Sequence, residues 1–133
     1  MGTHPQRRTA GKQRGQSSTV GLAAVSEASF QRAVTDLLSL RRYRWVHFRK
    51  SIDPRRKGQW RTALDGDRGF VDIFAARDGR ALAIELKGIH RSGQRGALSP
   101  DQKLWGLALV AVPGIEWFCW WPTDWDEIER VLR

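Results

Sequence analysis

Apolar residues recur at helical spacing after position 26 and alternate with polar residues after position 44. The first pattern predicts a helix over 26–40 that begins at an N-cap serine, Ser26. Its apolar stripe consists of Phe30, Val34, Leu37 and Leu38. The second pattern predicts a strand over 44–49. The polar residues 50–68 that follow predict a long loop, of the kind that is usually functional or mobile.

Two short apolar runs flank Asp78-Gly79, the residue pair that most strongly indicates a two-residue hairpin turn. A turn at these two residues sets the strand register and places Asp72 opposite Glu85. The same register gathers the aliphatic side chains on one face, and a shift by one residue would scatter them over both faces. These side chains are Val71, Ile73, Ala75, Leu82, Ile84 and Leu86. The opposite face then carries Asp72, Glu85 and Lys87.

The second half of the chain predicts a helix, a strand and a short final helix. Residues 99–102, of sequence SPDQ, are a strong helix start, because serine caps the helix, proline fits its first turn and glutamine closes a capping box. That helix runs to 113–114, residues 115–121 form an aromatic strand, and a last helix follows a cap at 123–124. The predicted order is α-β-β-β-α-β-α. This order indicates an α+β fold, an α/β/α sandwich around a mixed central sheet.

The charge of the chain, +9 at pH 7, points to a polyanion as partner. Residues 1–25 contain no acid and predict a disordered basic arm, which leaves 26–133 as one folded domain. A second basic cluster covers 41–61, and a solvated basic face is the alternative reading of it. The candidate DNA-binding residues in this cluster are Arg49, Lys50, Arg55, Arg56, Lys57 and Arg61.

Cys119 is the only cysteine, which excludes a disulfide framework and a cysteine-based metal cluster. Its apolar surroundings suggest an inert core thiol, and the lack of disulfides favours a cytoplasmic protein. No apolar run approaches the roughly 18 residues that a membrane span needs, so we expect no membrane partner.

Asp72 and Glu85 raise the question of chemistry, because an acid in an apolar strand costs free energy unless it is satisfied. Directly opposite residues have Cβ atoms about 4.5–5.5 Å apart, so the two carboxylates repel unless a cation lies between them. Hard oxygen donors suit Mg²⁺ or Mn²⁺. With Lys87 on the same face, the set is suited to metal-assisted phosphodiester hydrolysis. The alternative is an ordinary surface ion pair between Asp72 and Lys87.

Five ordered motifs resemble those of the VRR-NUC family, in its short phage and bacterial form, within the PD-(D/E)XK nuclease superfamily. They are S-E-x-x-F-Q at 26–31, G-x-x-D-I at 69–73, I-E-L-K at 84–87, L-S-x-x-Q at 98–102 and W-P-x-D at 121–124. The resemblance covers about 26–132, nearly the whole predicted domain. Val71 stands where the family usually has proline.

The resemblance implies a restriction-endonuclease-like αβββαβ core and a Mg²⁺-dependent DNA endonuclease. It implies that Asp72, Glu85 and the Leu86 carbonyl bind the metal, that Lys87 is the catalytic lysine, and that Glu27 is a further acid near the metal. Mn²⁺ is a possible substitute for Mg²⁺. It also implies a homodimer that acts on branched DNA, including four-way junctions.

Three further side chains are possible accessory residues, and each has an ordinary alternative. Gln31 lies one turn after Glu27 and is either a phosphate or water ligand or a solvated side chain. Gln102 is either part of the site or only the capping partner of Ser99. His47 is more readily an ordinary half-buried histidine than a phosphate contact. Glu27 itself begins a helix, where the helix dipole alone favours an acid.

Two other functions compete with a metal-dependent endonuclease. One is a catalytically inactive, nuclease-like module that only binds DNA through its charge. Such a module has no need for Asp72, Glu85 and Lys87 on one face. The other is an enzyme that acts on small phosphate esters, and it leaves the excess of positive charge without a purpose.

Overall fold

The computed structural model describes residues 25–48, 51–52, 60–61 and 65–133. The predicted basic arm, residues 1–25, lies outside this part except for Val25, which packs against the core. In the described part, no helix has the length and apolar character needed to cross a bilayer.

Four strands form the main sheet in the order β1-β4-β5-β6. The strands are β1 Arg44–His47, β4 Ile73–Arg77, β5 Arg80–Leu86 and β6 Ile115–Trp120. β1, β4 and β5 pair antiparallel, whereas β5 and β6 are parallel. The helices are α1 Glu27–Leu40, α2 Pro100–Val110 and α3 Trp125–Val131, with a short turn η1 Pro122–Asp124 before α3. The predicted α+β fold with a mixed sheet and a short C-terminal helix is therefore confirmed.

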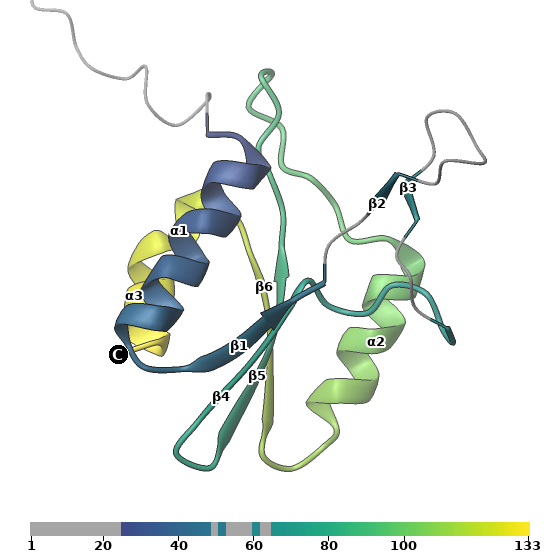
Figure 1. Ribbon diagram of the computed structural model, residues 1–133. Helices are drawn as coiled ribbons and strands as arrows, with labels where there is room; N and C mark the ends of the chain where they lie inside the picture. The colour runs from purple at the N-terminus through teal and green to yellow at the C-terminus, as the bar shows by residue number, and fades with distance from the viewer. Residues whose placement is uncertain (1–24, 49–50, 53–59, 62–64) are drawn as a thin grey trace, which may run out of the picture.

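The helices cover both faces of the sheet, with α1 and α3 on one side and α2 on the other (Figure 1). Side chains of α1, α3, β4, β5 and the buried Trp120 form the larger core, which includes all four residues of the predicted apolar stripe on α1. A smaller core lies under α2, where Leu109 packs with Val71 and Ala83. Gly106 lets α2 approach the sheet closely, because a Cβ at this position would lie 2.8 Å from the ring of Trp117.

The hairpin has the predicted register, since Ile73 pairs with Ile84 and Arg77 with Arg80. Asp78 and Gly79 have φ angles of 50° and 77°, the two positive values that a type I′ turn requires. Five of the six aliphatic side chains lie in the larger core, as predicted. Val71 is the exception.

Val71 belongs to the smaller core because the chain bends at Asp72, one residue before β4 begins. The alternation of a regular strand is lost at that bend, so the prediction that Val71 shares the face of Leu86 is wrong. Two boundaries and one loop also differ from the prediction. The first strand ends at His47, the second helix ends at Val110, and the predicted loop over 50–68 contains a two-stranded ladder of β2 Ser51–Ile52 and β3 Trp60–Arg61.

Arg80 anchors the hairpin end of β5 to its neighbours in the sheet and to α3. Its guanidinium binds both carboxylate oxygens of Glu116 and donates to the Val131 carbonyl at 2.6 Å and to the Tyr43 hydroxyl at 3.1 Å. The bond from Arg80 is the main reason that the pKa of Glu116 lies below its usual value, and the same pair raises the pKa of Arg80.

Glu116→Gln is expected to lower the free energy of unfolding at pH 7 by about 0.5–1 kcal/mol, a value reduced for solvent screening because both side chains are partly exposed. A carboxylate whose pKa is lower in the folded state stabilises the fold above its unfolded pKa of about 4.5. That contribution is lost as the pH falls below this value. Urea unfolding of both proteins at several pH values should therefore show a difference that shrinks in acid. Glu129→Gln, at an exposed position of α3, is the control.

Candidate active site

The carboxyl ends of the parallel strands β5 and β6 meet at one edge of the sheet, where ligands commonly bind in folds of this kind. Glu85 pairs with Cys119 and Leu86 with Trp120. The Lys87 amide continues the ladder by donating to the Trp120 carbonyl at 2.9 Å. Two of the predicted site residues, Glu85 and Lys87, thus occupy neighbouring positions on the same strand end.

Glu85 is 2% exposed although it carries a carboxylate. It shares the α2 side of β5 with Ala83, and the Gln102 amide group donates to its Oε1 atom at 2.8 Å. Gln102 also completes the capping box, since its Oε1 atom accepts from the backbone amide of Ser99 at 2.9 Å and its backbone amide donates to the Ser99 hydroxyl at 3.2 Å. One side chain therefore performs the predicted capping and also contacts a candidate site residue.

Asp72 lies in the bend before β4 rather than within a strand, which corrects the expected position directly opposite Glu85 in a regular ladder. Its Oδ2 atom accepts a hydrogen bond of 2.8 Å from the Leu86 amide. Its carbonyl accepts another of 2.8 Å from Phe48 and so holds the bend against the end of β1. The carboxylate of Asp72 is thereby fixed at Leu86, the residue that follows Glu85.

Within the described part of the chain, no ion pair joins Asp72 and Lys87. The alternative that these two residues are an ordinary surface pair therefore lacks its expected contact. The carboxylate of Asp72 binds backbone instead, and Lys87 is half-buried.

Gly69 determines how the segment before Asp72 meets α2. Its φ angle is 88°, a conformation that side chains other than glycine rarely adopt. A Cβ atom at this position would lie 2.7 Å from the Cβ of Asp101 and 2.8 Å from the amide nitrogen of Gln102. The close approach therefore requires glycine, and it fixes the start of α2 where Gln102 reaches Glu85.

Lys87 and Glu27 approach the same end of β5 from different elements. The stem of Lys87 lies against Gly96, where an added Cβ would be 3.7 Å from both its Cβ and its Cδ atoms. Glu27, at the start of α1, lies beside Gly88, where an added Cβ would be 3.8 Å from its Oε2 atom. The structure thus brings Glu27 from the opposite helical layer to the residue that follows Lys87.

The pKa of the Cys119 thiol reflects the charged side chains that lie near this edge of the sheet. The pKa of the Cys119 thiol is raised to about 11, mainly by burial and also by the negative charges of Glu85, Asp124 and Asp72, against an opposing effect of Lys87. The thiol is therefore protonated near neutral pH, as expected for an inert cysteine. Its neighbourhood is charged, however, rather than purely apolar as the sequence suggested.

The remaining predicted residues are less closely tied to this edge. Gln31 is half-buried on α1, and His47 ends β1 opposite Ile73, whose side chain lies in the larger core. Arg61 ends β3, where the side chains are outside the described part. The other five candidate DNA-binding residues lie outside the described residues altogether: Arg49, Lys50, Arg55, Arg56 and Lys57.

The donor set at this edge fits a hard divalent cation. The carboxylates of Asp72 and Glu85 are oxygen ligands of the kind that Mg²⁺ and Mn²⁺ prefer, and the Leu86 carbonyl, the third ligand that the resemblance implies, is an oxygen ligand as well. Within the described ranges, no group of three or more histidine, cysteine, aspartate or glutamate side chains could hold a metal ion. A site formed here would therefore depend on two carboxylates, on backbone oxygen and on water.

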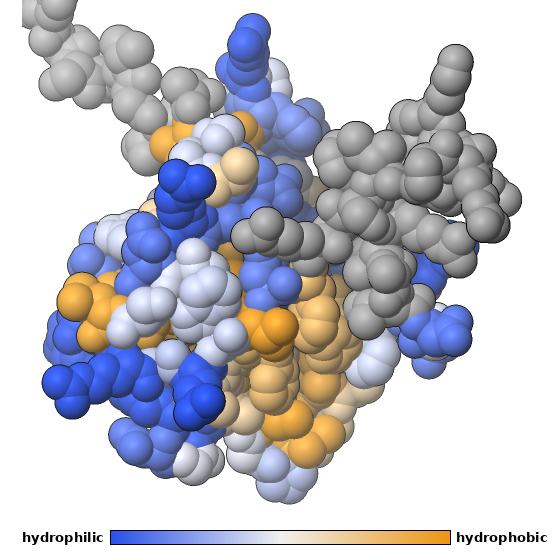
Figure 2. All heavy atoms as spheres, in the orientation of Figure 1, coloured by the Kyte–Doolittle hydropathy of each residue, from blue (hydrophilic) through white to orange (hydrophobic). Residues whose placement is uncertain are grey.

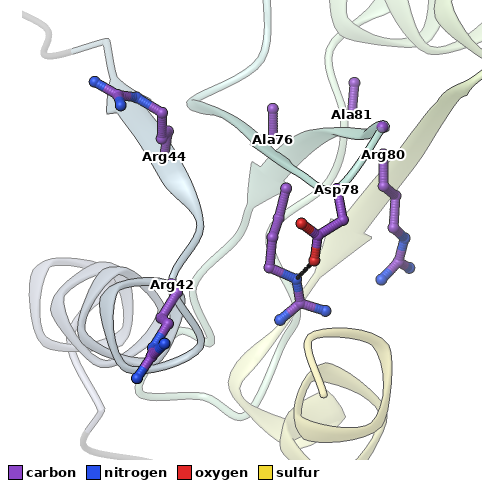
Figure 3. Close-up of a pocket in the computed structure, with 8 residues that line it drawn as sticks. Arg42, Arg44, Ala76, Asp78, Arg80 and Ala81 are labelled. Atoms are coloured by element: carbon purple, nitrogen blue, oxygen red, sulfur yellow. Dashed lines mark ion pairs between the residues drawn. The ribbon is translucent and has the colours of Figure 1, made fainter.

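A shallow hollow of about 480 Å³ lies at the other end of the hairpin, beside the Asp78-Gly79 turn (Figure 3). Its arginines do not converge on a common point, because Arg42 and Arg44 point away from each other in this view. Arg77 binds the carbonyls of Arg41 and Arg133 and pairs with Asp78. The hollow is therefore separate from the candidate active site. The two half-buried arginines that line it, Arg77 and Arg80, already bind structural partners.

Comparisons of the chain with protein-family models, with curated proteins and with solved structures found no match.

Proposed function

We propose that the protein is a Mg²⁺-dependent DNA endonuclease of the VRR-NUC type, which hydrolyses phosphodiester bonds and selects branched DNA such as four-way junctions. The observation that supports the proposal most strongly is that the carboxylate of Glu85 is buried, while the carboxylate of Asp72 is hydrogen-bonded to the backbone amide of the next residue, Leu86. Burying a carboxylate costs free energy, and a bound cation would offset that cost. Lys87 at the same strand end and the charge of +9 fit a phosphodiester substrate.

The side chains at this edge have distinct tasks in the proposed reaction. Asp72, Glu85 and the Leu86 carbonyl would hold the metal, with Glu27 as a further acid near it. The bound metal would polarise the phosphate and lower the pKa of a water molecule. Lys87 places a positive charge where negative charge develops on the phosphate. Gln102 keeps the Glu85 carboxylate in one orientation through its hydrogen bond of 2.8 Å.

The basic residues of the chain supply DNA affinity in this proposal. Contacts between cationic side chains and phosphates release counterions and depend little on sequence. The residues that we assign to this task are Arg49, Lys50, Arg55, Arg56, Lys57 and Arg61. A DNA-binding module without catalysis would use the same residues, in the same cytoplasmic compartment. The two functions differ in whether Glu85 and Lys87 are needed.

Incubation of the purified protein with linear, single-stranded, flap and four-way-junction DNA separates the two functions. The proposal requires cleavage in Mg²⁺, none in EDTA, and a preference for the branched substrates. Binding to all substrates with no cleavage in Mg²⁺ or Mn²⁺ would leave only the binding module. Equal cleavage of linear and branched DNA would retain the enzyme and remove its structural selectivity.

We also propose that the protein is a homodimer that associates through α2. The chain has no charged side chain between Leu104 and Ile115, and Leu104, Leu107 and Val110 are 64%, 73% and 61% exposed. Hydrophobic residues gather on the face that α2 and the neighbouring strands present in Figure 2. Two copies that each carry +9 repel over most of their surface, so an uncharged face is where they can meet.

The spacing of these side chains suits a symmetric contact. Leu104 and Val110 each lie three residues from Leu107, so an antiparallel pair of α2 helices with its two-fold axis near Leu107 would match apolar residues with apolar residues. Leu107→Glu is expected to convert a dimer into a monomer in sedimentation velocity. Leu40→Glu is the matched control, because Leu40 is 74% exposed on α1. A wild-type monomer, or the same loss with Leu40→Glu, would contradict the dimer.

A further inference from the structure

Arg95 lies in the loop that returns from β5 to α2, and this loop is folded back on itself. Ile89 and Arg95 form an antiparallel bridge, and the Gly96 amide donates to the Gly88 carbonyl at 2.9 Å. The indole nitrogen of Trp121 donates to the Gly96 carbonyl, also at 2.9 Å. The backbone around Arg95 is therefore tied to both β5 and the end of β6.

The guanidinium of Arg95 is fixed over the turn that follows β6. Its central carbon lies 5.0 Å from the centre of the Trp121 ring, and its Nη2 atom donates to the Thr123 hydroxyl at 2.9 Å. The same nitrogen lies 4.0 Å from a carboxylate oxygen of Asp124. The side chain is nevertheless 55% exposed, so the guanidinium keeps donors for an incoming group.

Trp121 connects Arg95 to the candidate active site. Leu86 pairs with Trp120, and the Lys87 amide binds the Trp120 carbonyl, so Lys87 and Trp121 occupy the next positions of the same parallel ladder. The stem of Lys87 lies against Gly96, the residue that follows Arg95. The folded-back loop that carries Arg95 is therefore adjacent to Lys87, at the edge of the sheet where Glu85 and Asp72 lie.

We propose that Arg95 is a DNA-binding residue of this site, whose guanidinium binds a phosphate of the substrate strand next to Lys87. The inference rests on the proposed function, because it takes the substrate to be a phosphodiester strand. A guanidinium presents a planar fork of donors that matches phosphate oxygens. Its contacts to Trp121 and Thr123 hold it in place before binding, so little side-chain freedom is lost when the phosphate arrives.

A purely structural role would have different consequences. If Arg95 only ties its loop to the turn at 122–124, replacing it would lower thermal stability and leave the dependence of DNA binding on salt unchanged. If Arg95 binds phosphate, removing its charge should reduce the slope of log affinity against log salt by about one unit. The salt slope therefore separates the two roles.

The test compares wild type with Arg95→Gln, Arg95→Lys and Arg91→Gln. Arg91 is an exposed arginine in the same loop and serves as the matched control. Dissociation constants for four-way-junction DNA are measured over a range of KCl concentrations in EDTA, and kcat and KM for cleavage are measured in Mg²⁺. Arg95→Gln is expected to raise Kd and KM about tenfold, the low end for loss of a charged hydrogen bond, and to change kcat less. Arg95→Lys and Arg91→Gln should both show the wild-type salt slope, because the first keeps the charge at position 95 and the second leaves Arg95 unchanged.

An unchanged salt slope in Arg95→Gln would overturn the inference, as would an equal effect of Arg91→Gln. If wild type cleaves DNA and Arg95→Gln does so with the same KM, this inference fails and the proposed function stands. If wild type binds but cleaves no DNA in Mg²⁺ or Mn²⁺, the proposed function fails and the assignment of Arg95 to its site fails with it.

Discussion

Glu85→Gln is expected to abolish Mg²⁺-dependent DNA cleavage and to leave the protein folded. Glutamine has nearly the same shape, and its side-chain oxygen can still accept the hydrogen bond from Gln102. The change removes only the charge, which is the property that the proposed metal site needs. We expect a loss of cleavage on the order of 10³-fold, the size that removal of one preorganised electrostatic group can reach. The free energy of unfolding should change little, because the hydrogen bond with Gln102 is kept.

Asp72→Asn should give the same loss of cleavage, since the asparagine oxygen can still accept from the Leu86 amide. Cleavage of end-labelled DNA and urea unfolding of the same preparations measure both properties. Glu129→Gln, an exposed substitution on α3, should retain both. Wild-type cleavage rates in Glu85→Gln or Asp72→Asn would show that the metal site lies elsewhere.

Lys87→Met is expected to remove turnover and to leave DNA binding nearly intact. Methionine keeps an unbranched apolar stem that can pack against Gly96, but it cannot stabilise negative charge on the phosphate. We expect kcat to fall by about 10²–10³-fold. The dissociation constant for junction DNA and the melting temperature should change little. Cleavage kinetics at saturating DNA measure kcat, and binding titrations measure the dissociation constant.

Lys103→Met is the matched control for Lys87→Met, because Lys103 is an exposed lysine on α2 with the same charge. It should cleave DNA at the wild-type rate. Unfolding of Lys87→Met would favour a structural role for the lysine. A wild-type kcat in Lys87→Met would remove Lys87 from the proposed chemistry.

The sequence predicted the hairpin well because its turn and its apolar pattern agree. Asp78-Gly79 favours positive φ at both positions, and the structure has them. The pattern could not reveal the bend at Asp72, because Val71 is equally apolar in a strand and in the smaller core. The ladder of β2 and β3 was also missed, since strands of two residues each leave no periodic signal.

The candidate site was only partly predictable for a different reason. Glu85 lies in β5 and Lys87 directly follows its end, so the alternation of the strand predicted both positions. Cys119 and Trp121 join them through the parallel pairing of β5 with β6, and no local pattern predicts which strands become neighbours. Arg95 was missed because an arginine in a glycine-rich loop has no spacing that indicates its partners.

Anomalous diffraction from crystals soaked in MnCl₂ is the sharpest test of the proposed metal site, because it locates the metal without assuming any activity. We expect a peak at the end of β5, with oxygens of Asp72, Glu85 and Leu86 about 2.1 Å from the ion, as for Mg²⁺. Crystals of Glu85→Gln grown and soaked in the same way should lack that peak. A manganese ion bound elsewhere, or an equal peak in Glu85→Gln, would show that these residues do not form the metal site.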